Sequence, residues 1–391
     1  MLNFLKGPLK VPEISICELF ERNAGVNKSQ PFMIFRGKFI TYFKFSKYIN
    51  SMAYELKAHG AYQNIVAVAI ENPPEFLISV LAAMKAGNSV MIFNEDNLNN
   101  EELFYFTVNK MNIKTVIICS KYIKKIKIHD DLTYIVSDAG YFLTTGKSLI
   151  NSLKSRNRIK YVKNILSLGD FIYSDNSINE YANNPNVKVI FSDGENIFAF
   201  DDNDITSETI IINYWMPKID RRPYFYSTMP VNTPLGFLYG IMIPLSFSGT
   251  SLYGDLKLLK KIDVDFLILD GIDPINNMGM ASYLDDIRYF ISPNYDEKLY
   301  EKILKEFKKG LISGYSSNLL LTTHLNPFTD IRPGSMGMIL NNINYKIDDD
   351  HIMYINSPMA AGIFNGKEFI KHEWYSTYRM VKIIDDYFYP L

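Results

Sequence analysis

The chain has 391 residues and a formal net charge of −1 at pH 7, with 47% hydrophobic and 21% charged residues. This length exceeds that of one small core and predicts two or three cores of ordinary size. The near-neutral charge provides no global field that would attract nucleic acid or an anionic membrane, so neither is expected as a partner.

The cysteines and the apolar segments of the sequence indicate in which cellular compartment the protein is expected. Cys17 and Cys119 lie far apart and lack a CxxC partner, so we expect no disulfide framework, no cysteine zinc site and a reducing, cytoplasmic location. Residues 1–13 lack the apolar run of a signal peptide. The most apolar stretch, residues 237–253, is interrupted by Pro244 and several serines, which predicts a buried helix ending in a loop and no membrane span.

Helical and strand patterns alternate up to residue 330, which predicts α/β layers. Ser15 stands three residues before Glu18, a capping-box pattern, and the unbroken apolar run at residues 65–70 suits a central parallel strand buried on both faces. A glycine turn at residues 36–38 separates two strand-like runs. In chain order we expect a helix from residue 15, strands at 32–35 and 39–42, and a helix at 44–59. Three further strands are expected at 65–70, 89–93 and 115–119, with helices at 75–86 and 101–111 between them.

Two oppositely charged blocks follow. A basic segment at residues 147–163 precedes an acidic one at residues 165–208, in which Lys188 is the only basic residue. We interpret them as solvated faces that can meet each other, because a nucleic-acid site would need more interleaved aromatic residues than Tyr161. From residue 330 onward, short β-like segments between Gly, Asn and Asp turns predict a small β-rich unit.

Four stretches carry a more specific pattern. They are residues 18–94, which contain Asn72-Pro73-Pro74-Glu75, residues 227–250 with the phrase MPVNTPLG, residues 288–315, and residues 330–337 (DIRPGSMG) followed by 357–364. In order and spacing they resemble the large domain of the adenylate-forming enzymes, the family of acyl-CoA synthetases and AMP-binding ligases. The resemblance implies an α/β fold with two αβα sandwich subdomains plus a small distorted β-barrel, at residues 1–165, 166–325 and 326–391.

The resemblance also implies ATP, Mg²⁺ and CoA as the cofactors of the family, and a mobile C-terminal small domain that carries a lysine. Because the sequence ends about where the hinge to that domain begins, we expect the small domain to be absent.

The phosphate loop of the family, rich in Ser, Thr and Gly and ending in Pro-Lys-Gly, corresponds to residues 187–204. Backbone amides, hydroxyls and a cation must surround the phosphates there. In this chain the loop is shortened, Gly194 is its only glycine and Lys188 precedes the expected strand. Acidic residues in this stretch would repel phosphates. They are Asp193, Glu195, Asp201, Asp202 and Asp204.

At the other motif positions, the residues that bind ligands in the family are also replaced. The histidine that abuts the acyl pocket in the family falls on Thr233, and the Gly-Gly-Ala phrase falls on Ser292-Pro293-Asn294-Tyr295, which fills the space that glycine leaves open. The Mg²⁺-binding glutamate falls on Leu319, which cannot ligate a metal. The ribose-binding aspartate, which follows a tryptophan represented here by Trp374, falls on Arg379.

These replacements predict a degenerate nucleotide or acyl pocket without catalytic residues, cofactor or metal. The segment from Tyr315 to Asn318 ranks first for a surviving site, because its hydroxyls and amide can hold a small polar ligand. The predicted pocket residues are Ser192, Asp193, Gly194, Thr233, Ser292, Gly314, Tyr315, Ser316, Ser317, Asn318, Trp374 and Arg379.

Other constellations favour plain structural roles. The histidines lack metal-ligand spacing, and residues 348–351 (DDDH) predict a solvated turn rather than a cation site. Several aromatic residues fit ordinary core packing better than an acyl tunnel. They are Tyr224, Phe225, Tyr226, Phe237 and Tyr239.

The leading hypothesis is a degenerate acyl-CoA synthetase-like protein that is not competent for ATP-dependent carboxylate adenylation. It would act as a small-molecule-binding or scaffolding module, with a small carboxylate or acyl group as its ligand. One alternative is an active AMP-forming acyl-CoA ligase completed by a separately encoded C-terminal domain. Another is a non-catalytic interaction subunit of a true ligase.

Overall fold

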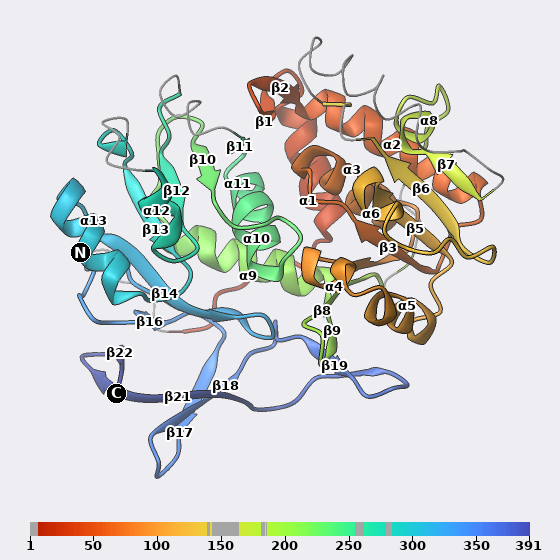
Figure 1. Ribbon diagram of the computed structural model, residues 1–391. Helices are drawn as coiled ribbons and strands as arrows, with labels where there is room; N and C mark the ends of the chain where they lie inside the picture. Colours follow the sequence, from red (N-terminus) through yellow and green to blue (C-terminus); the bar gives the residue numbers. More distant parts are fainter. Residues whose placement is uncertain are drawn as a thin grey trace.

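The computed structural model describes residues 7–138, 141–142, 164–180, 184, 186–254, 262–278 and 284–391. Within these residues, the strands form two nine-stranded sheets and one four-stranded sheet. Figure 1 shows the two large sheets next to each other, each flanked by helices, with the four-stranded sheet below them. The basic segment expected at residues 147–163 lies outside the described residues.

The first large sheet is built around parallel strands. In spatial order it contains β20 (Phe369–Ile370), β19 (Gly362–Phe364), β9 (Ile197–Asp201), β8 (Lys188–Ser192), β4 (Ser89–Ile92), β3 (Ile65–Ala69), β5 (Thr115–Cys119), β6 (Thr133–Ser137) and β7 (Ile165–Ser167). β3 pairs in parallel with β4 on one side and β5 on the other, and it is buried along almost its whole length. The prediction of a central parallel strand from its apolar run is confirmed.

The helices that flank this sheet are α1 (Ile16–Val26), α2 (Tyr42–Ala58), α3 (Pro73–Lys85), α4 (Glu95–Asn99), α5 (Glu101–Lys110), α6 (Ser120–Ile123) and α8 (Leu168–Ile172). Of these, α1, α2, α3 and α5 lie close to the residues that the sequence predicts, whereas α4, α6 and α8 were not predicted. At the start of α1, the Glu18 amide donates to Ser15 Oγ at 3.0 Å, which satisfies one of the amides that a helix N-terminus leaves free. α2 ends shortly before Gly60, whose φ of +83° favours glycine.

The second large sheet combines strands from distant parts of the chain. In spatial order it contains β16 (Met338–Ile339), β15 (Leu321–Leu325), β14 (Leu311–Ser317), β13 (Tyr289–Ser292), β12 (Phe266–Ile268), β10 (Tyr224–Ser227), β11 (Thr250–Tyr253), β1 (Pro31–Phe35) and β2 (Lys38–Thr41). The glycine turn predicted at residues 36–38 joins β1 to β2. The helices that accompany this sheet are α9 (Asp202–Trp215), α10 (Pro234–Phe237), the π-helix η1 (Leu238–Met242), α11 (Ile243–Ser246), α12 (Asp273–Met278) and α13 (Glu297–Phe307).

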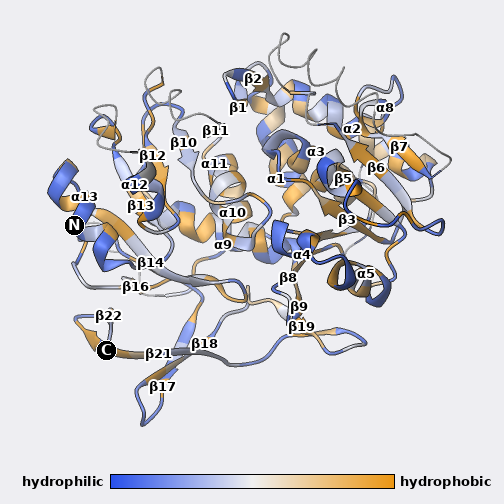
Figure 2. Ribbon diagram, viewed as in Figure 1, coloured by the Kyte–Doolittle hydropathy of each residue, from blue (hydrophilic) through white to orange (hydrophobic). Residues whose placement is uncertain are grey.

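The apolar stretch at residues 237–253 is helical through Ser246 and then turns into β11. Its helical part is buried apart from half-buried Ser246, as predicted. Among the described residues, no helix combines the length and apolarity that a membrane crossing requires. Figure 2 shows hydrophobic residues concentrated in strands and inner helices, and hydrophilic residues on outer helices such as α13.

The two large sheets interleave in sequence, which differs from the linear division at residues 165 and 325. The β1–β2 hairpin pairs with β11 in the second sheet, although it lies early in the chain. The β8–β9 hairpin pairs with β4 in the first sheet, and β19 extends that sheet through β9. Edge pairing between segments distant in sequence therefore sets the boundaries of the units.

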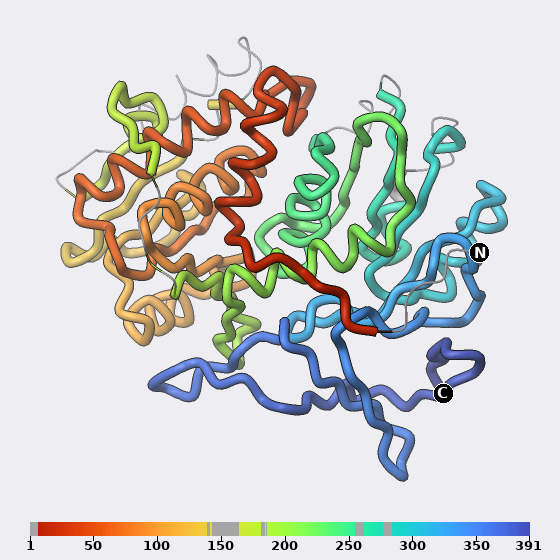
Figure 3. The backbone as a smooth tube through the Cα atoms, turned by 180° about the vertical axis from the view of Figure 1, so that it is seen from behind, coloured from red at the N-terminus to blue at the C-terminus, as the bar shows by residue number. Residues whose placement is uncertain are grey.

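The remaining strands form the predicted β-rich unit. The four-stranded antiparallel sheet contains β17 (Asn344–Ile347), β18 (Ile352–Asn356), β21 (Tyr375–Ile384) and β22 (Tyr387–Pro390). Between β17 and β18, Asp348 Oδ1 accepts from the amides of Asp350 and Ile352, which confirms a turn at residues 348–351. Figure 3 shows the N-terminal segment, in red, beginning beside this C-terminal region and running past α9 into α1.

Candidate functional site

Residues from four distant segments meet at a cavity of about 200 Å³, here called the site cavity. The segments are the residues that follow β4, the β8–β9 hairpin, the start of α10 and the end of β14. The lining residues are Ile92, Asn94, Asp96, Phe191, Ser192, Asp193, Phe198, Asn232, Thr233, Pro234 and Asn318. Four of the predicted pocket residues therefore lie together: Ser192, Asp193, Thr233 and Asn318.

The backbone amides of the loop between β8 and β9 donate hydrogen bonds to acceptors within the same hairpin. The Gly194 amide donates to Ser192 Oγ at 3.2 Å, and the amides of Glu195 and Asn196 donate to Asp193 Oδ1 at 3.1 and 2.7 Å. The Asp193 amide donates to the carbonyl of Asn196 at 3.2 Å. Gly194 has a φ of +95°, which the tight turn requires. The loop thus presents carboxylates, and its amides are already hydrogen-bonded within the turn.

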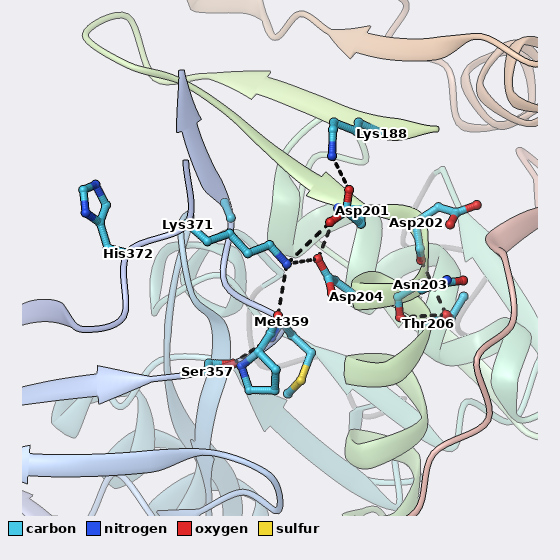
Figure 4. Close-up of polar contacts among 12 residues, drawn as sticks. Lys188, Asp201, Asp202, Asn203, Asp204, Thr206, Ser357, Met359, Lys371 and His372 are labelled. Atoms are coloured by element: carbon cyan, nitrogen blue, oxygen red, sulfur yellow. Dashed lines mark hydrogen bonds and ion pairs between the residues drawn. The ribbon is translucent and has the colours of Figure 1, made fainter. Parts of the chain in front are cut away.

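The other acidic residues of this stretch, Asp201, Asp202 and Asp204, lie at the opposite end of β9 from the loop. Asp201 and Asp204 form a capping box at the start of α9. Lys188 pairs with Asp201, its partner across the hairpin, and Lys371 Nζ lies 2.5 Å from Asp204 Oδ2 and 3.6 Å from Asp201 Oδ2 (Figure 4). Four strand residues lie between the loop and Asp201, so residues 196 and 201 are about 16 Å apart along an extended chain.

Burial and the neighbouring lysine charges shift the pKa values of these carboxyl groups. Burial raises the pKa of Asp202 to about 6, and it also raises the pKa of Asp204. At Asp201 burial acts in the same direction, but the hydrogen bond and charge of Lys188 and the charge of Lys371 lower the pKa overall. Asp201 is therefore the carboxylate that these lysines stabilise most.

Thr233, at the position of the family histidine, is held as a helix cap. Its Oγ1 donates to the carbonyl of Pro230 at 2.8 Å and accepts from the Gly236 amide at 3.1 Å. A Cβ at Gly236 would lie 1.7 Å from the Pro230 oxygen, so the tight approach requires glycine. Thr233 lines the cavity with its hydroxyl already hydrogen-bonded.

The segment predicted first for a surviving site, Tyr315 to Asn318, contributes one lining residue to the site cavity. Ser316 Oγ donates to the carbonyl of Pro293 at 2.9 Å, and Ser317 Oγ accepts from the Leu320 amide at 3.1 Å. A Cβ at Gly314 would meet the His324 carbonyl oxygen at 2.2 Å. Asn318 alone of these residues lines the site cavity.

Three predicted residues belong to other surfaces. Ser292 lines a separate cavity of about 250 Å³ after β12 and β13, and its Oγ donates to the carbonyl of Asn294 at 2.6 Å. Trp374 lies under Lys346, whose Nζ is 4.4 Å from the ring centroid. Arg379 hydrogen-bonds to Tyr315, where burial raises the pKa of the phenol and the arginine charge opposes that shift.

A buried glutamate that the sequence analysis missed lies behind this region. Glu208 of α9 is 0% exposed, and its Oε1 accepts from the Thr322 amide at 3.1 Å while Oε2 has no hydrogen-bond partner among the described residues. Burial raises the pKa of this carboxyl well above the ordinary value. Thr322 Oγ1 also contacts Tyr239 of the π-helix at 3.0 Å. Helical spacing from Ile205 to Ile212 places residue 208 inward, which was the available signal.

Sequence comparison identifies an N-terminal match. Residues 20–173 match the family of AMP-binding enzymes. Surfactin synthase subunit 2 of Bacillus subtilis is 23% identical over 154 residues, which are 39% of this chain and 4% of that protein. A plipastatin synthase protein of the same organism is 38% identical over 74 residues, 19% of this chain and 3% of that protein. The matched segments thus span only a few per cent of these curated relatives.

Solved structures match over nearly the whole chain. An anthranilate CoA ligase, AuaEII, in complex with anthranoyl-AMP has a TM-score of 0.79 at 14% identity, covering 97% of this chain and 78% of that one. A luciferase-like enzyme from the mealworm Zophobas morio has a TM-score of 0.78 at 11% identity, covering 99% of each chain. A benzoate CoA ligase from Burkholderia xenovorans has a TM-score of 0.77 at 13% identity, covering 96% and 79%.

The structural matches confirm the predicted fold of two αβα subdomains with an attached antiparallel unit. The match of residues 20–173 to the AMP-binding enzymes confirms, for that part of the chain, the resemblance on which the prediction rested.

Proposed function

We propose that this protein binds a small ligand in the site cavity and does not adenylate carboxylates with ATP. The observation that carries the proposal is the β8–β9 loop, whose amides are bound to Ser192 Oγ, to Asp193 Oδ1 and to the Asn196 carbonyl. A phosphate would have to displace these contacts and then face the carboxylates of Asp193 and Glu195. The residues present therefore do not fit a triphosphate.

The charge of the lining supports the same proposal. Among the described residues that line the site cavity, Asp96 and Asp193 are acidic and none is Lys, Arg or His. Loss of one preorganised donor to a developing anion typically slows catalysis by about 10²- to 10³-fold. Leu319, at the position of the Mg²⁺ ligand in the family, packs as a partly buried apolar residue against the core. No step through ATP or Mg²⁺ is derived from this set.

The ligand class follows from size and chemistry. A cavity of about 200 Å³ lies below the roughly 300–1,000 Å³ of drug-sized ligand pockets. Phe191 and Phe198 provide apolar walls, while Asn318 supplies an amide that can donate and accept. Of the two predicted ligand classes, an uncharged acyl group fits these walls better than a free carboxylate, which Asp96 and Asp193 would repel.

Titration calorimetry with MgATP, AMP and a non-hydrolysable acyl-adenylate analogue tests the proposal. We expect no saturable heat with MgATP up to millimolar concentration, with an aryl-CoA ligase of the same fold as the positive control. Tight Mg²⁺-dependent ATP binding would refute the proposal.

Pyrophosphate release with a panel of carboxylates tests the alternative of an active ligase. The assay is run with the chain alone and with a separately expressed small domain from its genomic neighbourhood. Release only in the second case would favour the ligase completed by a separate chain. Co-elution with a ligase of the same organism, without release, would favour the interaction subunit.

A further inference from the structure

Two carboxylates from different segments of the chain line the site cavity. Asp193 belongs to the β8–β9 loop and Asp96 to the first turn of α4, and both side chains are exposed. Neither carboxylate forms an ion pair with a described residue, and the described lining contains no Lys, Arg or His. The cavity therefore offers two negative charges to an occupant and has no counter-charge for them in its own wall.

A buried amide oxygen in the same wall points to a ligand independently of these charges. Asn232 lines the cavity with 5% of its surface exposed. Its Nδ2 donates to the Phe93 carbonyl at 3.3 Å, and because a carbonyl can only accept, this contact determines which atom of the amide is the oxygen. Asn232 Oδ1 has no hydrogen-bond partner among the described residues. Since buried polar atoms are normally paired, a donor on a bound molecule would complete this side chain.

The remaining lining suits an apolar chain with a carbonyl. Ile92, Phe191 and Phe198 are 1%, 3% and 1% exposed, and the two phenylalanine rings stack with centroids 6.0 Å apart. The exposed side chain of Asn318 carries an amide that can donate to an acyl carbonyl. An acyl ligand thus finds apolar walls for its chain and a donor for its carbonyl, while the acceptors of the cavity require a further group.

A protonated amine matches those acceptors. An ammonium group has three donors and no acceptor, and its attraction to a carboxylate is stronger beside apolar walls than in bulk water. A hydroxyl group would supply one donor and leave both charges without a counter-charge. We propose that the acyl ligand of the site cavity bears a protonated amine, which Asp193, Asp96 and Asn232 bind. This inference rests on the proposed function, because it names the chemistry of the ligand proposed there.

Three ligands with the same branched chain separate the effects of charge and shape. Leucinamide has an α-amine, which is mostly protonated at pH 7 because the pKa of such a group is about 7.7–8.0. Isocaproamide has the same chain and amide without the amine, and leucine has a carboxylate in place of the amide. We expect leucinamide to bind about tenfold more tightly than isocaproamide, as two exposed ion pairs would give, and leucine to bind more weakly than leucinamide.

Methyl NMR of the full-length, isoleucine-labelled protein shows where the ligand binds. Ile92 lines the cavity, and loss of its Cδ1 signal in the Ile92→Val variant assigns that signal. A saturable shift of this methyl signal during titration reports occupation of the site cavity and gives the affinity for each ligand.

Substitutions of the two carboxylates test their role. Asp193→Asn and Asp96→Asn should each reduce the preference for leucinamide by about threefold. Asparagine at residue 193 keeps an oxygen for the amides of Glu195 and Asn196, so the loop is preserved. Glu95→Gln removes the charge of the exposed neighbour of Asp96 outside the lining; it is the matched control and should leave the preference unchanged. Above about pH 9 the amine loses its proton, and the affinities for the two amides should converge.

Failure of this inference is distinguishable from failure of the proposed function. Equal affinities for leucinamide and isocaproamide at Ile92 overturn the amine preference and leave ligand binding in place. A preference that persists in the Asp96→Asn/Asp193→Asn double variant overturns the role of these carboxylates. Displacement of leucinamide by micromolar calcium would reassign the acceptors to a metal ion and overturn the inference. Tight binding of MgATP, by contrast, refutes the proposed function whichever amide binds.

Discussion

Replacing Glu75 by glutamine should remove a pH dependence from the stability of the protein. Glu75 lies in the first turn of α3 with 2% of its surface exposed. Its Oε2 accepts from Ser137 Oγ and from Asn72 Nδ2, the latter at 3.3 Å. Burial raises the pKa of this carboxyl from 4.5 to about 7; the two hydrogen bonds oppose the shift and the charge of Asp138 adds to it.

The direction of the pH effect on stability follows from the proton that Glu75 retains in the folded state. Below pH 4.5 the carboxyl is neutral in both states, so its contribution to folding is fully present. As the pH rises towards 7, the unfolded chain ionises while folded Glu75 stays protonated, and stability falls. A shift from 4.5 to about 7 at about 1.36 kcal/mol per pKa unit corresponds to about 3 kcal/mol. Glutamine keeps an oxygen for Ser137 and Asn72 but cannot ionise.

Urea unfolding at pH 5 and pH 8, followed by circular dichroism, measures this effect. The free energy of unfolding of the Glu75→Gln variant, relative to the wild type, should rise by about 2.5 kcal/mol between the two pH values, because part of the effect is already present at pH 5. Glu102→Gln, at an exposed residue of α5, is the control for the loss of a carboxylate from the surface. If the difference for Glu75→Gln is the same at both pH values, this account of the buried carboxyl is wrong.

Three further outcomes follow from individual contacts. Gly236→Ala should destabilise the fold by more than about 3 kcal/mol, because its Cβ would lie 1.7 Å from the Pro230 oxygen, and thermal unfolding measures this. Lys371→Met should cost about 1 kcal/mol, since the pair with Asp204 is partly exposed, and should speed hydrogen exchange in β20. Burial lowers the pKa of His324 to about 3, so stability should fall as the pH drops below 6.5; His324→Gln should reduce that fall in an acid titration.

Local elements were predictable because their signals are local. Ser15 before Glu18, the glycine turn at residues 36–38 and the apolar run at residues 65–70 each determine a backbone conformation within a few residues. The order of the strands within the sheets was not predictable, since it depends on which strand edges pair with each other. Nothing in the β1–β2 hairpin reveals that it pairs with β11 rather than with β3.

The candidate site was predictable only as far as the resemblance reaches. It indicated Ser192, Asp193, Thr233 and Asn318, which lie together at the site cavity. It did not reveal the pairing of Lys188 with Asp201 across the β8–β9 hairpin, because the register of that hairpin is not visible in the sequence. Glu208 was missed although helical spacing places residue 208 inward, because a carboxyl side chain is ordinarily assigned to the surface.

The pairing register of the β8–β9 hairpin also affects whether a positive charge is available to bind a phosphate at the β8–β9 loop. Lys188 belongs to β8 and Lys371 follows β20, and both pair with carboxylates at the start of α9 (Figure 4). Lys371 also donates to the Pro358 carbonyl at 3.1 Å, so it links the start of α9 to the segment that contains residue 358. To reach a phosphate at the loop, either lysine would have to leave Asp201 or Asp204, and the abandoned carboxylate would be partly buried without its partner. The charges that could hold a nucleotide are therefore part of what holds the hairpin to its neighbours, and a gain of nucleotide binding would weaken the fold at that point.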